Sequence, residues 1–228
     1  MSERPKALVT GASRGVGEAV ARALAPTHHV LLGGRDEAAL ARLAAELPDA
    51  RPWPVELSEV TEADLDGVDR LDVLVHNAGI CRLGRITEQT AADWRETFEV
   101  NVVAVAELTR LALPALRAAS GHVVCVNSGS GQRANPGWAS YAASKFALRA
   151  FADALRLEEP GIRVTTVYPG RVATDLQRAV RRHEGGPFEP EKYLTPETVA
   201  RAVVAALTAG PDAHLTELTL RPIAGPAN

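Results

Sequence analysis

Cysteine is scarce in this sequence. The 228 residues contain only two, Cys81 and Cys125, too few for a disulfide framework or for a zinc site with four cysteine ligands. Both lie in or beside apolar runs. We therefore expect two small buried side chains in a reducing compartment, and we expect no metal site.

The sequence also lacks long hydrophobic runs and a large excess of charge. No stretch approaches the roughly 18 apolar residues of a membrane span, and the apolar run 7–9 is too short for a signal peptide. The net charge of −3 excludes a strongly basic, phosphate-neutralising surface over the whole chain. We expect a soluble, cytoplasmic protein that binds neither nucleic acid nor membranes.

What the sequence does contain is a regular alternation of short apolar runs and longer helix-like segments. Most short runs are continuously apolar, as is typical of strands buried on both faces of a parallel sheet. Strands are expected at 6–10, 29–33, 52–56, 72–76, 122–127, 163–168 and 215–220, and helices at 15–25, 36–47, 61–65, 91–119, 138–158 and 196–208. The pattern predicts one α/β domain over residues 1–228, a doubly wound (Rossmann) sheet of about seven parallel strands with helices on both faces.

Two connections depart from this alternation. Only residues 57–71 separate the third and fourth expected strands, which leaves room for about two helical turns. The stretch 171–193 is too long for a plain connector and has no clean helical period, so we interpret it as a substrate lid. Its arginines would suit an anionic substrate, although a solvated helix face explains them more simply.

A glycine-rich turn, residues 11–17, follows the first expected strand and leads into a helix. Glycines let the backbone approach a phosphate, and the free N–H groups of a helix N-terminus attract it. The spacing differs from the common G-x-G-x-x-G fingerprint, and a plain tight turn is the alternative. The position after the first strand of a doubly wound sheet favours a nucleotide site.

The end of the second expected strand bears on the choice between NAD and NADP. An acidic side chain there usually binds the ribose 2′-hydroxyl of NAD, whereas an arginine accommodates a 2′-phosphate. Here Gly34 and Arg35 end the strand, Asp36 follows, and Arg14 is nearby in the glycine turn. Because Asp36 opens a helix, we assign it to the helix cap. Arg35 and Arg14 then predict NADP(H), with a ribose contact from Asp36 as the alternative.

Tyr141 and Lys145 are four residues apart near a helix start, so they share one helical face. Free tyrosine has a pKa near 10, and a nearby cation lowers that value. Such a phenol can exchange a proton with an oxygen atom that undergoes redox change.

Ser128 and Asn101 are two further polar candidates. Ser128 follows the fifth apolar run, at the sheet edge where doubly wound folds bind ligands, although serine is also a common turn former. Asn101 lies in an otherwise apolar helical segment, where asparagine is unfavourable unless its amide has a purpose. A core asparagine bonded to the backbone is the simpler alternative.

Taken together, these positions resemble the short-chain dehydrogenase/reductase family, in its short core branch without a long C-terminal extension. The resemblance covers essentially the whole chain. The motifs occur in order as Thr10-Gly11-x-x-x-Gly15-x-Gly17, Asn77-Ala78-Gly79, Asn101, Ser128, Tyr141-x-x-x-Lys145, and Pro169-Gly170 followed by Thr174.

The resemblance implies roles for four catalytic residues. Tyr141 would be the general acid/base and Ser128 would steady the substrate oxygen. Lys145 would bind the nicotinamide ribose and lower the pKa of the phenol, and Asn101 would hold a water that relays protons. The expected cofactor contacts are Gly11, Ser13, Arg14, Gly15, Val16, Gly17, Arg35, Glu56, Leu57, Asn77, Ala78, Gly79, Tyr141, Lys145, Pro169, Gly170, Val172 and Thr174.

One departure from the family pattern concerns the residues that contact the adenine of the cofactor. The family usually has aspartate and a small apolar residue after the third strand, where this chain has Glu56-Leu57. The short connection 57–71 is also atypical.

The sequence therefore predicts an NADP(H)-dependent oxidoreductase that transfers hydride between nicotinamide and a small-molecule carbonyl or alcohol. The resemblance and the apolar character of the segments 91–119 and 138–158 predict a homodimer or homotetramer. The alternatives are an NAD-dependent member of the family and a non-catalytic, nucleotide-sensing protein of the same fold. Neither Ser128 nor Ser130 lies in the G-x-S-x-G elbow of a serine hydrolase.

Overall fold

A parallel sheet of seven strands forms the centre of the protein in the computed structural model, which describes residues 4–223. The strands lie in the order β3-β2-β1-β4-β5-β6-β7, which confirms the predicted doubly wound fold. Their bounds are β1 Lys6–Thr10, β2 His29–Gly34, β3 Ala50–Pro54, β4 Val73–His76, β5 His122–Val126, β6 Arg163–Pro169 and β7 Glu217–Leu220. The order reverses between β1 and β4, the point at which such sheets bind ligands beyond the carboxyl ends of the strands.

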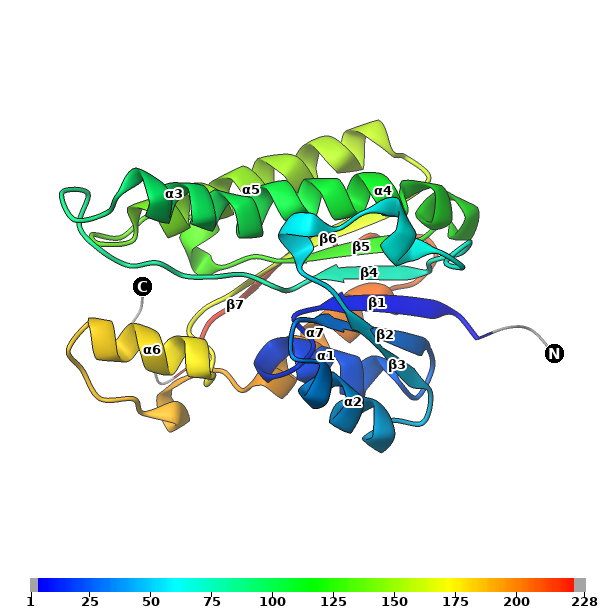
Figure 1. The fold of residues 1–228 in the computed structure, drawn as a ribbon, viewed down its shortest axis with the longest axis horizontal. Helices are drawn as coiled ribbons and strands as arrows, with labels where there is room; N and C mark the ends of the chain where they lie inside the picture. The colour runs from blue at the N-terminus through cyan, green and yellow to red at the C-terminus, as the bar shows by residue number, and fades with distance from the viewer. Residues whose placement is uncertain (1–3, 224–228) are drawn as a thin grey trace.

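Helices cover both faces of the sheet (Figure 1). One face carries α1 (Gly15–Leu24), α2 (Glu37–Glu46) and α7 (Pro196–Leu207). The opposite face carries α3 (Ala91–Phe98), α4 (Ala104–Ala119) and α5 (Ala139–Glu158). A further helix, α6 (Asp175–His183), lies beyond one end of the sheet, at the left of Figure 1.

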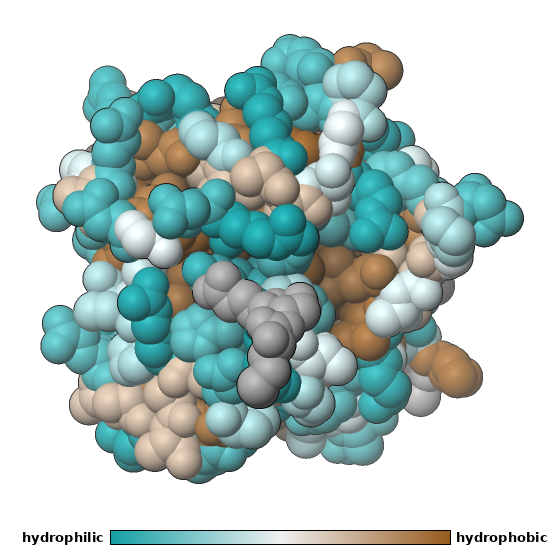
Figure 2. All heavy atoms as spheres, turned by 90° about the vertical axis from the view of Figure 1, so that its right-hand side faces the viewer, coloured by the Kyte–Doolittle hydropathy of each residue, from teal (hydrophilic) through white to brown (hydrophobic). Residues whose placement is uncertain are grey.

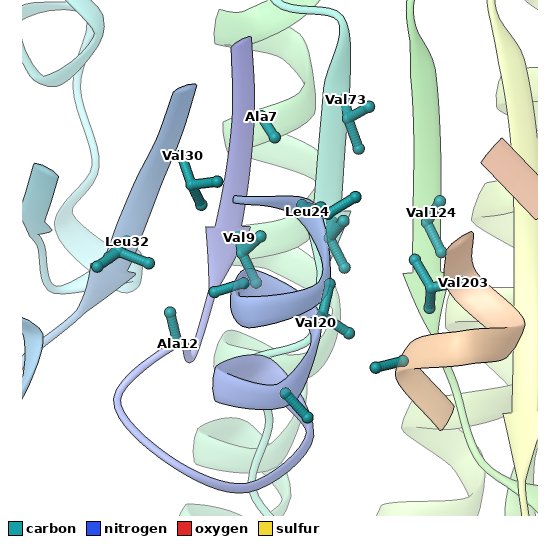
Figure 3. Close-up of a cluster of buried hydrophobic side chains, with 14 of the residues drawn as sticks. Ala7, Val9, Ala12, Val20, Leu24, Val30, Leu32, Val73, Val124 and Val203 are labelled. Atoms are coloured by element: carbon teal, nitrogen blue, oxygen red, sulfur yellow. The ribbon is translucent and has the colours of Figure 1, made fainter. Parts of the chain in front are cut away.

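The two cores show why the strands are apolar on both faces. Side chains alternate along a strand, so Ala7 and Val9 of β1 join one buried cluster while Leu8 joins the other. Figure 3 shows the first cluster, in which Val20 of α1 and Val203 of α7 cover the sheet. Because both faces are buried, the strands carry continuous apolar runs in place of alternating ones.

Several elements differ from the sequence-based expectation. Strand β3 begins and ends two residues earlier than expected, and its prolines are tolerated because it is an edge strand. The expected long helix 91–119 is interrupted by a π-helical turn at Glu99–Val103. The short connection before β4 holds only two 3₁₀ turns, Leu57–Glu59 and Glu62–Leu65.

The stretch 171–193 contains more regular structure than its sequence pattern indicated. Helix α6 and a 3₁₀ turn at Pro190–Lys192 occupy much of it. The apolar residues Leu176, Ala179 and Val180 do follow a helical period, but α6 has only nine residues, so the period covers little of the stretch 171–193.

The end of the molecule at the right of Figure 1 is mostly hydrophilic, with small scattered apolar areas (Figure 2). Within residues 4–223, no helix is both long and apolar enough to cross a membrane.

Candidate active site

A cleft beyond the carboxyl ends of the central strands brings together residues from distant parts of the chain. Of the residues predicted for the site, it is lined by Val16, Asn77, Gly79, Ser128, Tyr141, Lys145, Pro169, Gly170, Val172 and Thr174. The other predicted residues lie outside this lining: Gly11, Ser13, Arg14, Gly15, Gly17, Arg35, Glu56, Leu57, Ala78 and Asn101.

The glycine turn passes so close to the end of β4 that side chains do not fit. Gly11 has a φ of +65°, and a Cβ atom there would lie 3.0 Å from the Cα of Ala78. A Cβ atom on Gly17 would lie 2.1 Å from the carbonyl oxygen of Gly11. The Asn77 amide ties the turn to β4, because its Nδ2 donates to the Thr10 oxygen at 3.0 Å. The turn is therefore held in a shape that exposes backbone.

The N-terminus of α1 lacks a side-chain cap. Arg14 occupies the N-cap position in extended conformation and makes no capping hydrogen bond. Helix α2, by contrast, is capped by Asp36, whose Oδ1 accepts from the Ala39 N–H at 2.9 Å. Free N–H groups at a helix N-terminus are suited to bind an anion such as phosphate. The open turn and the uncapped helix thus fit a dinucleotide cofactor.

The arginines predicted to bind a 2′-phosphate lie at the surface. The side chain of Arg35 is 76% exposed, and its Nη1 is 3.5 Å from a carboxylate oxygen of Glu56. Arg14 is exposed as well. Leu57 instead packs against the core cluster that contains Trp53. Asp36 acts as a helix cap, the role that the sequence analysis assigned to it.

Tyr141 and Lys145 are both buried on α5, with only 7% and 4% of each residue exposed. The Lys145 ammonium donates to the Val126 oxygen at 3.4 Å and lies 5.8 Å from the centre of the Tyr141 ring. Burial lowers the pKa of Lys145 to about 8. Lysine therefore places a partly desolvated cation next to the phenol.

The Tyr141 phenol holds its proton at neutral pH. Burial is the largest cause and raises its pKa above the usual value, and a contribution from Cys81 acts in the same direction. A hydrogen bond with the Ser128 side chain acts in the opposite direction and lowers the pKa. The phenol is thus set up as a proton donor beside a second hydroxyl group.

Asn101 fixes the loop after β4 against α5. In the π-helical turn, its Oδ1 accepts from the Ile80 N–H and its Nδ2 donates to the Ile80 oxygen, both at 2.9 Å. Nδ2 also donates to the Ser144 hydroxyl at 3.0 Å, which in turn donates to the Tyr141 carbonyl oxygen at 2.7 Å. These bonds match the simpler alternative, a core asparagine bonded to backbone, and they position the helix turn that carries Tyr141.

Asn127 is a positioning residue that the sequence analysis missed. Its Nδ2 donates to the Lys145 carbonyl oxygen at 3.0 Å, and its Oδ1 accepts from the Ser128 N–H at 2.8 Å. A Cβ atom on Gly131 would lie 2.5 Å from the same Oδ1. Its position next to Ser128, at the end of a buried strand, was the available signal.

Gln177, from α6, is a second cleft residue that the sequence analysis missed. Only 7% of it is exposed, and its Nε2 has no hydrogen-bond partner in the part of the chain that the structure describes. Nearby, the Thr174 hydroxyl accepts from the Gln177 backbone N–H at 3.3 Å. A Cβ atom on Gly15 would lie 3.3 Å from Thr174 Cγ2, so the glycine turn and α6 meet here. Gln177 contributes to the cleft lining, and a buried amide without a partner is a group that a ligand oxygen would satisfy.

The arginines of the stretch 171–193 are largely occupied by local contacts. Both terminal nitrogens of Arg171 lie 2.8 Å from the Glu184 carboxylate, and Arg181 binds the same carboxylate. Arg178 packs over the Phe188 ring at 4.1 Å. These contacts favour the simpler explanation, in which the arginines serve the helix itself.

Comparisons with known proteins show which family and which solved structures this chain is similar to. The model of the short chain dehydrogenase family matches residues 5–185. An uncharacterized oxidoreductase from Staphylococcus epidermidis is 32% identical over 230 residues, which cover 95% of this chain and 96% of that protein. Dehydrogenase/reductase SDR family member 11 from Bos taurus is 33% identical over 246 residues, and the match covers 95% of this chain and 95% of that protein. The alcohol dehydrogenase from the archaeon Thermococcus sibiricus, solved with 5-hydroxy-NADP, superposes with a TM-score of 0.90 at 30% identity, covering 99% of this chain and 100% of that one.

Proposed function

Because the chain belongs to the short-chain dehydrogenase family and is similar to oxidoreductases, we propose that it is an NADP(H)-dependent enzyme acting on a carbonyl/alcohol pair. The observation that carries the proposal is the meeting of Ser128, Tyr141 and Lys145 in one cleft beside the glycine turn. The similar alcohol dehydrogenase that was solved with 5-hydroxy-NADP supports the cofactor type.

Proton transfer is the part of the reaction that this chain performs. The bound nicotinamide supplies or accepts the hydride. In the reductive direction, Tyr141 donates its phenolic proton to the substrate oxygen, and Ser128 holds that oxygen by a hydrogen bond. The buried Lys145 ammonium stabilises the phenolate left behind, because an opposite charge in a desolvated site favours the ionised form. Asn101 and Asn127 keep α5 and Ser128 in position.

The residues that would hold the cofactor divide between the two sides of the cleft. The glycine turn and the free N–H groups of α1 would bind the diphosphate. Arg14 and Arg35 would bind the 2′-phosphate. On the other side, the nicotinamide carboxamide would be bound by Thr174 and by the Gln177 amide, whose Nε2 has no partner within residues 4–223. The segment 171–193 contributes Gln177 and Tyr193 to the cleft lining, which supports its role as a substrate lid.

The test is kcat/KM with NADP(H) and with NAD(H). We expect a preference for NADP(H) of tenfold or more, because charge-assisted hydrogen bonds contribute roughly 1.5–3 kcal/mol each before screening. Arg35→Ala should raise KM for NADP(H) about tenfold and leave NAD(H) nearly unchanged. Arg42→Ala removes an exposed cation from neighbouring α2 and serves as the control.

Two results would contradict the proposal. Equal loss with both cofactors, or a wild type that prefers NAD(H), would mean that Arg35 is a surface charge. Tight nucleotide binding without turnover of any carbonyl or alcohol would favour the nucleotide-sensing alternative.

We also propose that the protein is a cytoplasmic homodimer or homotetramer. Val103 is 49% exposed and Phe146 is 42% exposed, and both belong to the helical layer of α3, α4 and α5. An association through this layer would bury both side chains. Light scattering at micromolar concentration should give a dimeric or tetrameric mass, and a monomeric mass would refute the proposal.

A further inference from the structure

The charge of the cleft is one-sided. Among residues 4–223, the cleft lining includes the cations Arg133, Lys145, Arg171, Lys192 and Arg221 and no aspartate or glutamate. Three of these cations already contact other side chains of the protein. Lys145 lies beside Tyr141, Arg171 is paired with Glu184, and Lys192 is paired with Glu189 at 2.7 Å. Arg133 and Arg221 remain.

Arg221 differs from Arg133 because its guanidinium is held in place. Its Nη1 donates to the Tyr168 and Leu220 carbonyl oxygens at 3.1 Å each, and its Nη2 donates to Gln132 Oε1 at 2.9 Å. The Gln132 amide is itself anchored, since its Nε2 donates to the Thr219 hydroxyl at 3.1 Å. All three acceptors are neutral, so the part of the chain that the structure describes positions the positive charge of Arg221 without compensating it. Both arginines are exposed, but within residues 4–223 the Arg133 side chain has no such anchors.

Arg221 also lies next to the proposed catalytic serine. A Cβ atom on Gly129, the residue after Ser128, would lie 3.5 Å from Nη2 and 3.6 Å from Cζ of Arg221. The guanidinium is therefore within van der Waals range of the backbone that follows Ser128. Three of the five N–H donors of an arginine are used by the protein oxygens, which leaves donors for a ligand.

We propose that Arg221 is a specificity-determining residue that binds a carboxylate of the substrate, so that the enzyme acts on oxo acids and the corresponding hydroxy acids. This inference rests on the proposed function. A planar guanidinium can hold a carboxylate by two parallel hydrogen bonds, which would orient the neighbouring carbonyl group toward Ser128 and Tyr141. Within the described residues, the cleft lining holds no acidic side chain that would repel such a substrate.

The experiment compares matched pairs of 2-oxo and 3-oxo acids with their methyl esters, at fixed ionic strength and saturating NADPH. For the wild type we expect kcat/KM to be at least tenfold higher with an acid than with its ester. Arg221→Met should lower kcat/KM for the acid at least tenfold, mainly through KM, and change the ester less than threefold. Arg221→Lys should recover part of the preference because it keeps the charge but not the bidentate geometry.

Two further variants separate binding from folding and from general charge effects. Gln132→Leu removes one anchor of the guanidinium and should reduce the acid preference by a smaller factor than Arg221→Met does. Arg182→Met removes an exposed cation of α6 that lies outside the cleft lining, and it should leave the preference unchanged. Ester turnover by each variant reports that the enzyme is folded.

Several results would overturn the proposal. These are an ester turned over as well as its acid, an equal loss of acid and ester turnover in Arg221→Met, or a tenfold weaker Kd of this variant for NADPH, which would assign Arg221 to the cofactor. If no carbonyl compound is reduced, the proposed function itself fails. The affinity of the wild type for the acid and for the ester is then measured by the quenching of bound NADPH fluorescence. Equal affinity for both compounds refutes the proposed role of Arg221.

Discussion

The two helices that border the cleft, α5 and α6, use polar side chains in opposite ways. On α5, Tyr141 and Lys145 are buried and are positioned through neutral hydrogen bonds from Asn101, Asn127 and Ser144. On α6, most charged side chains are exposed, and Glu184 just beyond its end joins Arg171 and Arg181. Lys145, which has no ionic partner within residues 4–223, therefore lies at the proposed chemical centre, while paired charges stabilise the segment 171–193.

The largest expected effect tests the α5 side. Tyr141→Phe should lower kcat by a factor of about 10²–10⁴, because the phenolic hydroxyl alone moves the proton. The Kd for NADPH should stay within a few-fold, since the ring is kept. Steady-state kinetics and a fluorescence titration measure the two quantities.

The matched control for that variant is Tyr193→Phe, which removes a hydroxyl group from the opposite, lid side of the same cleft. It should keep most of the turnover. If Tyr141→Phe retained more than about a tenth of the wild-type kcat, the assignment of the general acid would be wrong.

A second change on α5 should separate activity from stability. Lys145→Met should reduce both turnover and cofactor affinity, yet raise the free energy of unfolding by about 1–3 kcal/mol, because a buried ammonium is costly. The folded-state pKa of about 8 lies below the usual 10.5. The increase in the free energy of unfolding of Lys145→Met over the wild type should therefore be largest below pH 8. It should shrink as the pH rises from 8 toward 10.5.

Urea unfolding at several pH values measures this gain, with Lys192→Met as the control because Lys192 lies at the surface and pairs with Glu189. A Lys145→Met variant that is less stable than the wild type at pH 7 would mean that the ammonium is better solvated than its burial indicates.

The smallest effect is expected on the α6 side. Glu184→Gln removes the carboxylate shared by Arg171 and Arg181, and should loosen the lid and raise the substrate KM about three- to tenfold, equivalent to about 0.7–1.4 kcal/mol. The kcat value should change less than twofold because Tyr141 and Lys145 stay in place. Arg70→Gln, which breaks an exposed ion pair with Asp72 outside the cleft lining, is the control. A large fall in kcat with unchanged KM would contradict the division between the two helices.

The fold was predictable from the sequence because its signals are local. Continuous apolar runs indicate buried parallel strands, and helix-like segments between them indicate crossovers. The glycine turn and the Tyr141/Lys145 pair are also local patterns. The cleft lining includes Tyr141, Lys145, Ser128 and Asn77, which the sequence analysis had assigned to one site. Their catalytic roles stay predictions for the experiments above.

The residues that escaped the sequence analysis depend on contacts between distant segments. Whether the amide of Gln177 has a partner is decided by what surrounds α6. Arg221 appears in the sequence as one arginine among many, and it becomes distinctive only where β7 brings it over Gly129. In the same way, the ion pairs of the lid arginines depend on how the chain turns after α6.

By itself, the sequence determined the sheet, its helical layers and part of the cleft lining, including Ser128, Tyr141 and Lys145, because the hydrophobic period and the local motifs can be recognised within short segments. Only the tertiary structure decided which charges remain uncompensated. Arg171 and Arg221 are chemically identical, but Glu184 neutralises the first, while neutral oxygens position the second. The field of a charge depends on what lies within a few ångströms of it in space, and the chain order does not record that distance.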